Sequence, residues 1–245
     1  MTLTRKVRSG AAALYRWRWP VGWWRLRRRS TLNIGGQPIA FGQIGGTSNE
    51  WWALSARRHG WEQPVVDAFV AGLRPGDVVY DVGAWIGPYT LLASKLVGAR
   101  GRVISFEPDP IARAQLERNV TLNRAGNVQI LPIALSDHNG TARLSGGGSE
   151  AVVGPTGAAE VPTMTLPDLI AKEGAPDVIK VDIEGGELRL DVEALSRARV
   201  VFLEVHVAAF SAAGTDSDDY VAGVAAGRPI VRLEGDADNY NVRIG

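Results

Sequence analysis

The residues best suited to chemistry lie in two apolar segments in the second half of the chain. The segment "IKVDI" carries Lys180 and Asp182, with Glu184 two positions further, and "FLEVH" carries Glu204 and His206. Charged side chains inside such runs are costly to bury without partners. Side chains two apart on a strand share a face, so Asp182 with Glu184, and Glu204 with His206, can each point into one crevice.

We expect Asp182, Glu204 and His206 to be the catalytic residues. Carboxylates beside an imidazole can remove the proton of an alcohol, with His206 as the general base. The same three residues are also the candidate ligands of a magnesium or manganese ion, which would make the alcohol more acidic. One histidine and two acids are a thin signature for a metal, so the prediction is a metal-free base. Lys180 is expected to form a structural ion pair with a nearby carboxylate.

A second group of residues surrounds the stretch "VVYDVGAWIGPYTLL", residues 78–92. It predicts a strand, a tight glycine turn and a helix opened by Pro88, which is where α/β proteins hold nucleotide-like ligands. Asp81 stands where the dinucleotide fingerprint has its first glycine, and a carboxylate there would repel a pyrophosphate. S-adenosylmethionine carries two positive charges and no phosphate, so Asp81, Gly83, Ala84 and Gly87 are predicted to bind it.

Glu107 ends the next predicted strand. An acid about 20 residues beyond a glycine loop commonly binds ribose hydroxyls, and adenosine keeps both of them. Glu107 is therefore predicted to bind the cofactor. The alternative for this group is structural: Asp81 would cap the following helix and Glu107 would be a solvated strand end.

The elements that must position these residues alternate between strand and helix after residue 60. This pattern predicts an α/β fold with a largely parallel sheet, helices on both faces and a hairpin inserted after the third strand. The predicted helices are 64–73, 88–96, 110–123, 166–174, 187–195 and 216–226. The predicted strands are 78–82, 102–108, 127–135, 177–183, 199–206, 229–233 and 240–244, and the hairpin pairs 141–146 with 159–166.

Composition divides the 245 residues into a basic, tryptophan-rich arm (residues 1–45) and a domain (residues 46–245). Nine Arg and Lys residues precede Glu50, the first acid, and all eight tryptophans lie before residue 86. The arm could contact an anionic membrane surface, nucleic acid or only solvent. Trp51, Trp52 and Trp61 could form a lid over a sugar or pack the arm onto the domain. With no cysteine, no secretory signal and no membrane-length apolar run, the expected location is the cytoplasm, with peripheral membrane contact through the arm.

With these motifs in view, the chain resembles the FkbM-type family of S-adenosylmethionine-dependent methyltransferases over about residues 60–210. The resemblance is carried by "VYDVGAWIGPYT", "ISFEPDP", "NVQILPIALSD", "VPTMTLPDLI", "IKVDIEGGE" and "VFLEVH". It implies the class I (Rossmann-like) methyltransferase sheet of seven strands with the last antiparallel, and O-methylation. It also implies that Ala134, Leu135 and Ser136 surround the adenine, although a plain turn is an equal alternative, and that Glu62 reaches the cofactor's ammonium. Trp85 departs from the family pattern.

The expected function is S-adenosylmethionine-dependent O-methylation of a small-molecule, oligosaccharide or glycolipid acceptor. An RNA methyltransferase is a weaker alternative, because "DIEG" after the fourth strand differs from the Asn/Asp-Pro-Pro-aromatic motif of amine methylation. Nucleic acid is therefore an unlikely partner. A non-catalytic scaffold that docks at membranes through the arm is the third hypothesis, and the set of cofactor carboxylates speaks against it.

Overall fold

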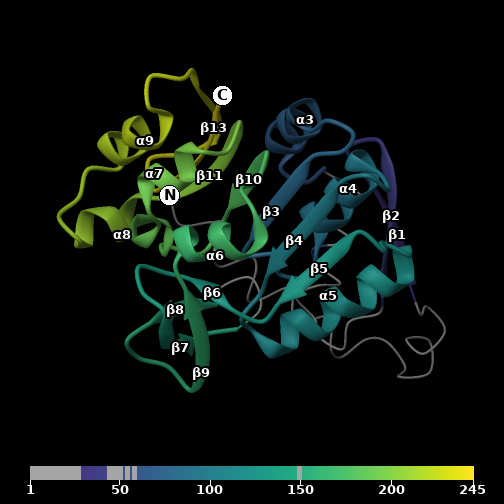
Figure 1. Cartoon of the computed structure of the whole chain (residues 1–245), viewed down its shortest axis with the longest axis horizontal. Helices are drawn as coiled ribbons and strands as arrows, with labels where there is room; N and C mark the ends of the chain where they lie inside the picture. The colour runs from purple at the N-terminus through teal and green to yellow at the C-terminus, as the bar shows by residue number, and fades with distance from the viewer. Residues whose placement is uncertain (1–28, 43–51, 53–55, 57–59, 148–150) are drawn as a thin grey trace, which may run out of the picture.

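A seven-stranded sheet lies at the centre of the computed structural model, which describes residues 29–42, 52, 56, 60–147 and 151–245 (Figure 1). Most of the predicted arm (residues 1–28), together with Trp51 and His59, lies outside the described residues. Within the described part, no helix is both long enough and apolar enough to cross a bilayer.

The sheet has the strand order β12-β13-β11-β10-β3-β4-β5. Its strands are β3 (Val78–Val82), β4 (Arg102–Phe106), β5 (Val128–Leu131), β10 (Val178–Val181), β11 (Val200–His206), β12 (Ile230–Gly235) and β13 (Asn239–Ile244). The neighbouring pairs among β5, β4, β3, β10 and β11 are parallel, whereas β13 runs antiparallel to both β11 and β12. The predicted class I methyltransferase sheet, with its last strand antiparallel, is confirmed.

Helices cover both faces of this sheet, because alternate strand residues point to opposite sides. On β3, for example, Val79 packs with one apolar cluster and Tyr80 with the other. The helices that contribute to the first cluster are α3 (Gln63–Gly72) and α4 (Pro88–Val97), and α5 (Pro110–Asn123) packs beside α4. Those of the second cluster are α6 (Leu166–Glu173), α7 (Val192–Ser196), α8 (Val207–Ala212) and α9 (Ser217–Ala225).

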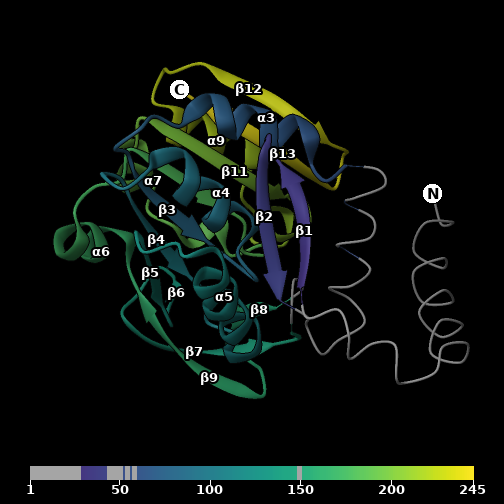
Figure 2. The ribbon, with the colours of Figure 1, turned by 90° about the vertical axis from the view of Figure 1, so that its right-hand side faces the viewer.

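A β-hairpin that the sequence analysis did not predict packs on the α4–α5 side (Figure 2). It consists of β1 (Arg29–Ile34) and β2 (Gln37–Gly42), joined by Gly35 and Gly36. Both glycines have positive φ, 55° and 76°, as a two-residue hairpin turn that follows the strand twist requires. The apolar side chains of the hairpin, Leu32, Ile34, Ile39 and Phe41, are buried in the cluster with α3 and α4.

Two asparagines of α5 fix this hairpin in place. The Asn119 side chain is fully buried; its Oδ1 accepts from the Gly42 amide at 2.8 Å and its Nδ2 donates to the Ile86 carbonyl at 2.8 Å. The Asn123 Oδ1 accepts from the Ala40 amide at 2.9 Å, and its Nδ2 donates to the Ala40 carbonyl at 2.6 Å. Strand β2, the inner strand of the hairpin, is therefore bonded to the same helix that supports the glycine loop.

The predicted inserted hairpin is confirmed as part of a larger structure. Strands β7 (Gly140–Ser145) and β9 (Ala159–Met164) are antiparallel, and β6 (Ala134–Leu135) and β8 (Val152–Gly154) complete a four-stranded sheet. The predicted third strand, residues 127–135, is divided between the two sheets. Pro132 follows the last residue of β5 and has no N–H to continue the ladder.

The predicted helix over residues 187–195 is also divided. A 3₁₀ turn, η3 (Glu187–Arg189), is followed by α7, which starts after its N-cap, Asp191. Leu190, between the two, has an extended backbone with φ −81° and ψ 142°, which interrupts the helix. The Tyr220 hydroxyl bonds to the Glu187 carbonyl at 2.6 Å and lies 3.3 Å from that of Leu190. Helix α8, which begins directly after β11, was not predicted.

Candidate active site

The glycine loop between β3 and α4 is wedged between the ends of β4 and β10. The amides of Gly83 and Ala84 both donate to the Phe106 carbonyl at 3.1 Å. Gly83 has φ 83°, and a Cβ there would lie 1.8 Å from the Asp182 carbonyl oxygen. At Gly87, a Cβ would lie 2.4 Å from Leu116. Glycine is therefore required at both positions by the packing of the loop against β10 and α5.

Asp81 lies under this loop and is almost fully buried, with 1% of its surface exposed. Its Oδ2 accepts from the Thr90 hydroxyl at 2.5 Å, and Thr90 in turn bonds to Ser105 at 2.8 Å. Burial raises the pKa of Asp81, against the opposing effects of Lys180 and Thr90. Asp81 also accepts from the backbone amide of Thr90, so it satisfies a group in the first turn of α4, whose N-cap residue is Gly87.

Glu107 is not the solvated strand end that the structural alternative required. It is 5% exposed, and its two oxygens accept from the amides of Trp85, at 2.7 Å, and Asp109, at 2.8 Å. Burial raises its pKa to about 7. A carboxylate has about four acceptor positions, so roughly two remain for the hydroxyls of a ribose.

Glu62 reaches the same region from the turn before α3. It has φ 44° and its Oε2 accepts from the Tyr89 hydroxyl at 2.7 Å. Burial raises the pKa of Glu62, and Lys180 counteracts this shift. The Lys180 Nζ lies 4.5 Å from the centre of the Tyr89 ring. The Tyr89 side chain thus contacts both Glu62 and Lys180 of β10.

Lys180 forms the expected structural ion pair. It is 3% exposed and its Nζ donates to the Asp182 Oδ2 at 2.9 Å. Burial alone would lower its pKa, but Asp182, Asp81 and Glu62 together raise it above the usual range for lysine. For Asp182, burial opposes ionisation, but the charge and hydrogen bond of Lys180, the charge of His206 and a bond with Glu204 together lower the pKa. Both groups are therefore charged in neutral solution.

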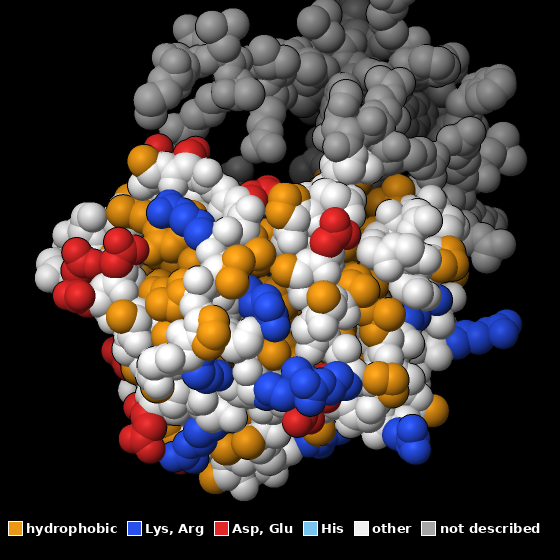
Figure 3. Space-filling model, turned by 90° about the horizontal axis from the view of Figure 1, so that it is seen from above, with side chains coloured by type: hydrophobic (Ala, Val, Ile, Leu, Met, Phe, Trp, Pro, Cys, Tyr) orange, Lys and Arg blue, Asp and Glu red, His pale blue; other side chains and the backbone are white. Residues whose placement is uncertain are grey.

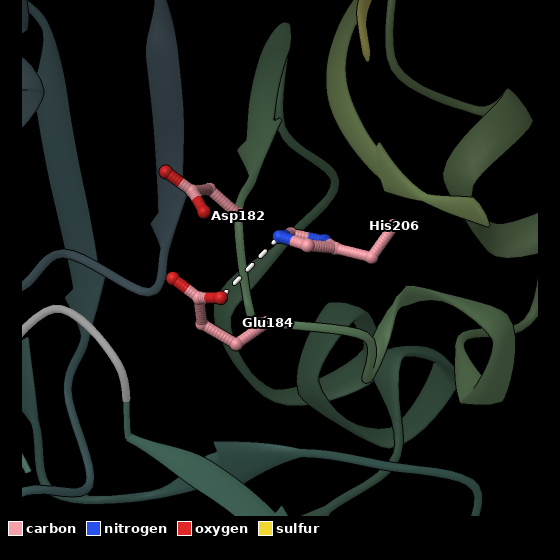
Figure 4. A group of neighbouring side chains, drawn as sticks. All are labelled: Asp182, Glu184 and His206. Atoms are coloured by element: carbon pink, nitrogen blue, oxygen red, sulfur yellow. Dashed lines mark ion pairs between the residues drawn. The ribbon is translucent and has the colours of Figure 1, made fainter. Parts of the chain in front are cut away.

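The three predicted catalytic residues meet where β10 and β11 end. Figure 4 shows two of them, Asp182 and His206, together with Glu184. The His206 Nε2 lies 4.0 Å from the Glu204 Oε1 and 3.4 Å from the Glu184 Oε2. One ligand atom from each of Asp182, Glu184 and His206 lies within 4.8 Å of the others. The structure therefore adds Glu184 to the predicted group, because its left-handed backbone, φ 53°, turns the chain back directly after β10.

Glu187 is a residue of this site that the sequence analysis missed. Its side chain is fully buried, and its Oε1 accepts from the His206 Nδ1 at 2.8 Å and from the amides of Ile183 and Gly185 at 3.3 Å. Its Oε2 has no hydrogen-bond partner among the described residues. The available signal was its place as the last acid of the K-x-D-x-E-G-x-E motif.

These contacts set the protonation of His206 and Glu204. Burial alone would lower the pKa of His206, but Glu184 and Glu187 raise it to about 10. Burial, followed by the charge of Asp182, raises the pKa of Glu204 to about 8. A protonated imidazole cannot accept a proton. His206 could act as the predicted base only after losing that proton.

The predicted adenine segment begins in β6 of the four-stranded sheet, and Trp52 packs against Trp85 of the glycine loop. Ala134 and Leu135 are buried in β6, and the Ser136 amide donates to the Met164 carbonyl at 3.0 Å. Their role around the adenine stays a prediction. Trp52 meets the rings of Phe41, Trp61 and Trp85 at 5.2–5.4 Å between centroids, which favours packing over a free lid.

Comparison with known proteins agrees with this geometry. Residues 81–222, more than half of the chain, match the family model of the methyltransferase FkbM domain. The hexuronic acid methyltransferase AglP of Haloferax volcanii is 28% identical over 174 residues, which cover 64% of this chain and 65% of that protein. The 31-O-demethyl-FK506 methyltransferase FkbM of Streptomyces tacrolimicus is 45% identical over 74 residues, 30% of this chain and 27% of that protein. The chain thus spans less than two thirds of the length of each relative.

A solved structure supports the fold. Methyltransferase FkbM from Methylobacillus flagellatus superimposes with a TM-score of 0.51 at 18% identity, over 71% of this chain and 44% of the other. At this identity the likeness concerns the fold alone. The glycine loop, the buried acids at the strand ends and the family match support S-adenosylmethionine as the methyl donor. The chain belongs to the FkbM methyltransferase family.

Proposed function

We propose that this protein transfers a methyl group from S-adenosylmethionine to a hydroxyl of a carbohydrate, a glycolipid or a related secondary metabolite. The observation that carries the proposal is the convergence of Asp182, Glu204 and His206 at the strand ends beside the glycine loop. Among acceptors, a sugar that contains a hexuronic acid is the first candidate, because the relative AglP is named as a hexuronic acid methyltransferase.

The residues around the glycine loop fit the cofactor. Gly83, Ala84 and Gly87 would leave room for it against the backbone, and Glu107 would accept from the ribose hydroxyls with its remaining acceptor positions. Asp81 and Glu62 would place negative charge near its ammonium. Ala134, Leu135 and Ser136 would border the adenine. The cofactor supplies an activated methyl group on a sulfonium, so the protein's own tasks are alignment and proton removal.

The reaction is an in-line displacement in which the acceptor oxygen bonds to the methyl carbon. The carbon–sulfur bond breaks, its electron pair stays on the sulfur, and the hydroxyl proton goes to a base. Glu204 is the best-placed base by geometry, because Asp182 is paired with Lys180, and His206 is held by Glu184 and Glu187. Because the pKa of Glu204 is raised to about 8, it can take the proton only in its ionised form, so methyl transfer should become faster as the pH rises through 8. Asp182 and His206 would orient the acceptor.

The alternatives have less support. On the face seen in Figure 3, the Lys and Arg side chains of the described residues are interspersed with acidic and apolar ones. A scaffold without activity would have no need of buried, mutually charged groups such as Lys180 and Asp182, which are costly to maintain.

The test is incubation of the purified chain with deuterium-labelled methyl donor and a panel of uronic-acid and neutral glycosides, followed by mass spectrometry. We expect methylated uronic-acid products, with Glu204→Gln strongly reduced and Glu193→Gln, an exposed acid, unchanged. Mild alkali then separates the two chemistries, because it cleaves a methyl ester of the carboxyl group and leaves a methyl ether intact. Transfer to nucleic acid alone, or only alkali-labile product, would contradict O-methylation of a hydroxyl.

A further inference from the structure

We propose that Asp182, Glu184 and His206 bind a divalent cation, with Glu187 as the outer carboxylate that orients the histidine. The role of this cation in activating the acceptor rests on the function proposed above, whereas its binding does not. The ligand set differs from the set expected from the sequence, because Glu184 takes the place of Glu204.

One pair of donor atoms already has the spacing of metal ligands, and the third lies nearby. Ligands at about 2.1 Å from an ion lie about 3.0 Å apart in adjacent octahedral positions, and about 3.4 Å apart in tetrahedral ones. The His206 Nε2 and the Glu184 Oε2 are 3.4 Å apart, and Asp182 contributes an atom within 4.8 Å of both. Figure 4 shows the three side chains directed toward one another from β10, its following turn and β11. Side-chain movements of a few tenths of an ångström to about 1 Å would bring all three donor atoms to the spacing of metal ligands.

The second observation is the environment of the histidine. Metal-binding histidines almost always donate their other ring nitrogen to a carboxylate or carbonyl, which fixes the ring and the tautomer. The His206 Nδ1 bonds to the Glu187 Oε1 at 2.8 Å, so Nε2 is the nitrogen that faces Asp182 and Glu184. Glu187 is itself fully buried and held by the amides of Ile183 and Gly185, and its Oε2 has no partner among the described residues.

The third argument is charge. Four carboxylates surround His206: Asp182, Glu184, Glu187 and Glu204. Lys180 is the cation that faces this group from β10, and it is shared between Asp182 and the Tyr89 ring. The protonated His206 is the second cation of the group, and a bound divalent cation would replace its Nε2 proton in compensating for the carboxylates. Two carboxylate oxygens and one imidazole nitrogen suit Mn²⁺, and three protein ligands leave positions open for water or an acceptor hydroxyl.

In the reaction, the ion would hold the acceptor oxygen and make its hydroxyl more acidic. The proton would then pass to Glu204, whose Oε1 lies 4.0 Å from the His206 Nε2 on the neighbouring side of the cluster. Methyl transfer to this oxygen follows the displacement described above. The site therefore gives Asp182, Glu184 and His206 one shared task.

The direct test measures Mn²⁺ binding to the full chain. The protein is first freed of metal with a chelator and desalted, and Mn²⁺ is then added. Binding is followed by the loss of the electron paramagnetic resonance signal of the free ion. We expect one ion per chain, at least tenfold weaker binding in Glu184→Gln, and about tenfold to hundredfold weaker binding in Glu187→Gln. Glu193→Gln, a surface acid paired with Arg197, is the matched control and should bind as the wild type does. Absence of binding at millimolar Mn²⁺, or equal binding by wild type and Glu184→Gln, would overturn the proposal.

Activity separates this inference from the proposed function. Methyl transfer that persists unchanged in EDTA would refute the ion's role and leave the O-methyltransferase proposal standing. Mn²⁺ binding with the expected variant pattern, but no methylation of any hydroxyl acceptor, would refute that function and leave the metal site standing. Melting temperatures show whether Glu187→Gln still folds. If it does not, Glu184→Gln, whose side chain is 35% exposed, decides the question alone.

Discussion

Replacing Gly83 by alanine should damage both stability and cofactor binding, and the size of the effect follows from two contacts. The left-handed backbone at φ 83° costs an alanine about 1–2 kcal/mol. The new Cβ would lie 1.8 Å from the Asp182 carbonyl oxygen, whereas carbon–oxygen contacts are ordinarily about 3.3 Å or longer. The loop or the end of β10 must therefore move by roughly 1.5 Å, at a further cost of about 1–3 kcal/mol.

Gly76 provides the matched control. It has φ 94°, but nothing lies within 4 Å of a Cβ placed there. Gly76→Ala thus retains the backbone cost and lacks the collision. The collision alone should lower the melting temperature of Gly83→Ala by about 2–12 °C relative to Gly76→Ala, at about 2–4 °C per kcal/mol for a chain of this size.

The assays are thermal unfolding and calorimetric titration with S-adenosylmethionine. Displacement of the loop should weaken binding in Gly83→Ala by more than tenfold, which is about 1.4 kcal/mol, and leave binding in Gly76→Ala unchanged. Equal melting temperatures and equal affinities in the two variants would refute the view that the loop is fixed by its contact with β10.

Three further variants test the remaining contacts. Glu107→Gln should weaken cofactor binding about tenfold to hundredfold, as loss of a charged acceptor predicts, with the exposed Glu117→Gln as control. Because the pKa of Glu107 is raised to about 7, wild-type affinity should fall as pH decreases through 7 and the variant's should not; a flat wild-type profile would contradict the ribose role. Asn119→Ala should lower the free energy of unfolding by about 2–4 kcal/mol, since two buried backbone groups lose their partners, and an unchanged value would show that water replaces it. Tyr220→Phe should cost about 1 kcal/mol in chemical unfolding, unless the 3₁₀ turn re-forms as helix.

The sequence was most informative where local chemistry decides the structure. Helix α5 spans the predicted residues 110–123, because Asp109 caps its start and Pro110 suits its first turn. The parallel order of the main strands followed from strands joined by helices. The hairpin of residues 29–42 was not predicted, although Gly35-Gly36 lies between alternating apolar residues.

The proximity of residues in the candidate active site could be predicted from the sequence, but the turns that complete it could not, and the roles of these residues stay predictions. The pairs of residues on β10 and β11 correctly placed Asp182, Glu204 and His206 together. The role of Glu187 could not be read from its charge, because its burial depends on the 3₁₀ turn and on Tyr220, which lies 33 residues later. Likewise, the turn at Glu184 depends on a backbone conformation that a glutamate adopts only when its surroundings impose it.

The bonds between α5 and β2 also determine how deletion experiments on this chain should be interpreted. A variant that starts at residue 29 keeps the whole hairpin, whereas one that starts at residue 43 removes the partners of Asn119 and Asn123 and uncovers apolar surface on α3 and α4. Such surface promotes aggregation during expression and purification. Loss of activity in the shorter variant would thus report on a damaged fold, and only the cut before residue 29 isolates what the first 28 residues contribute.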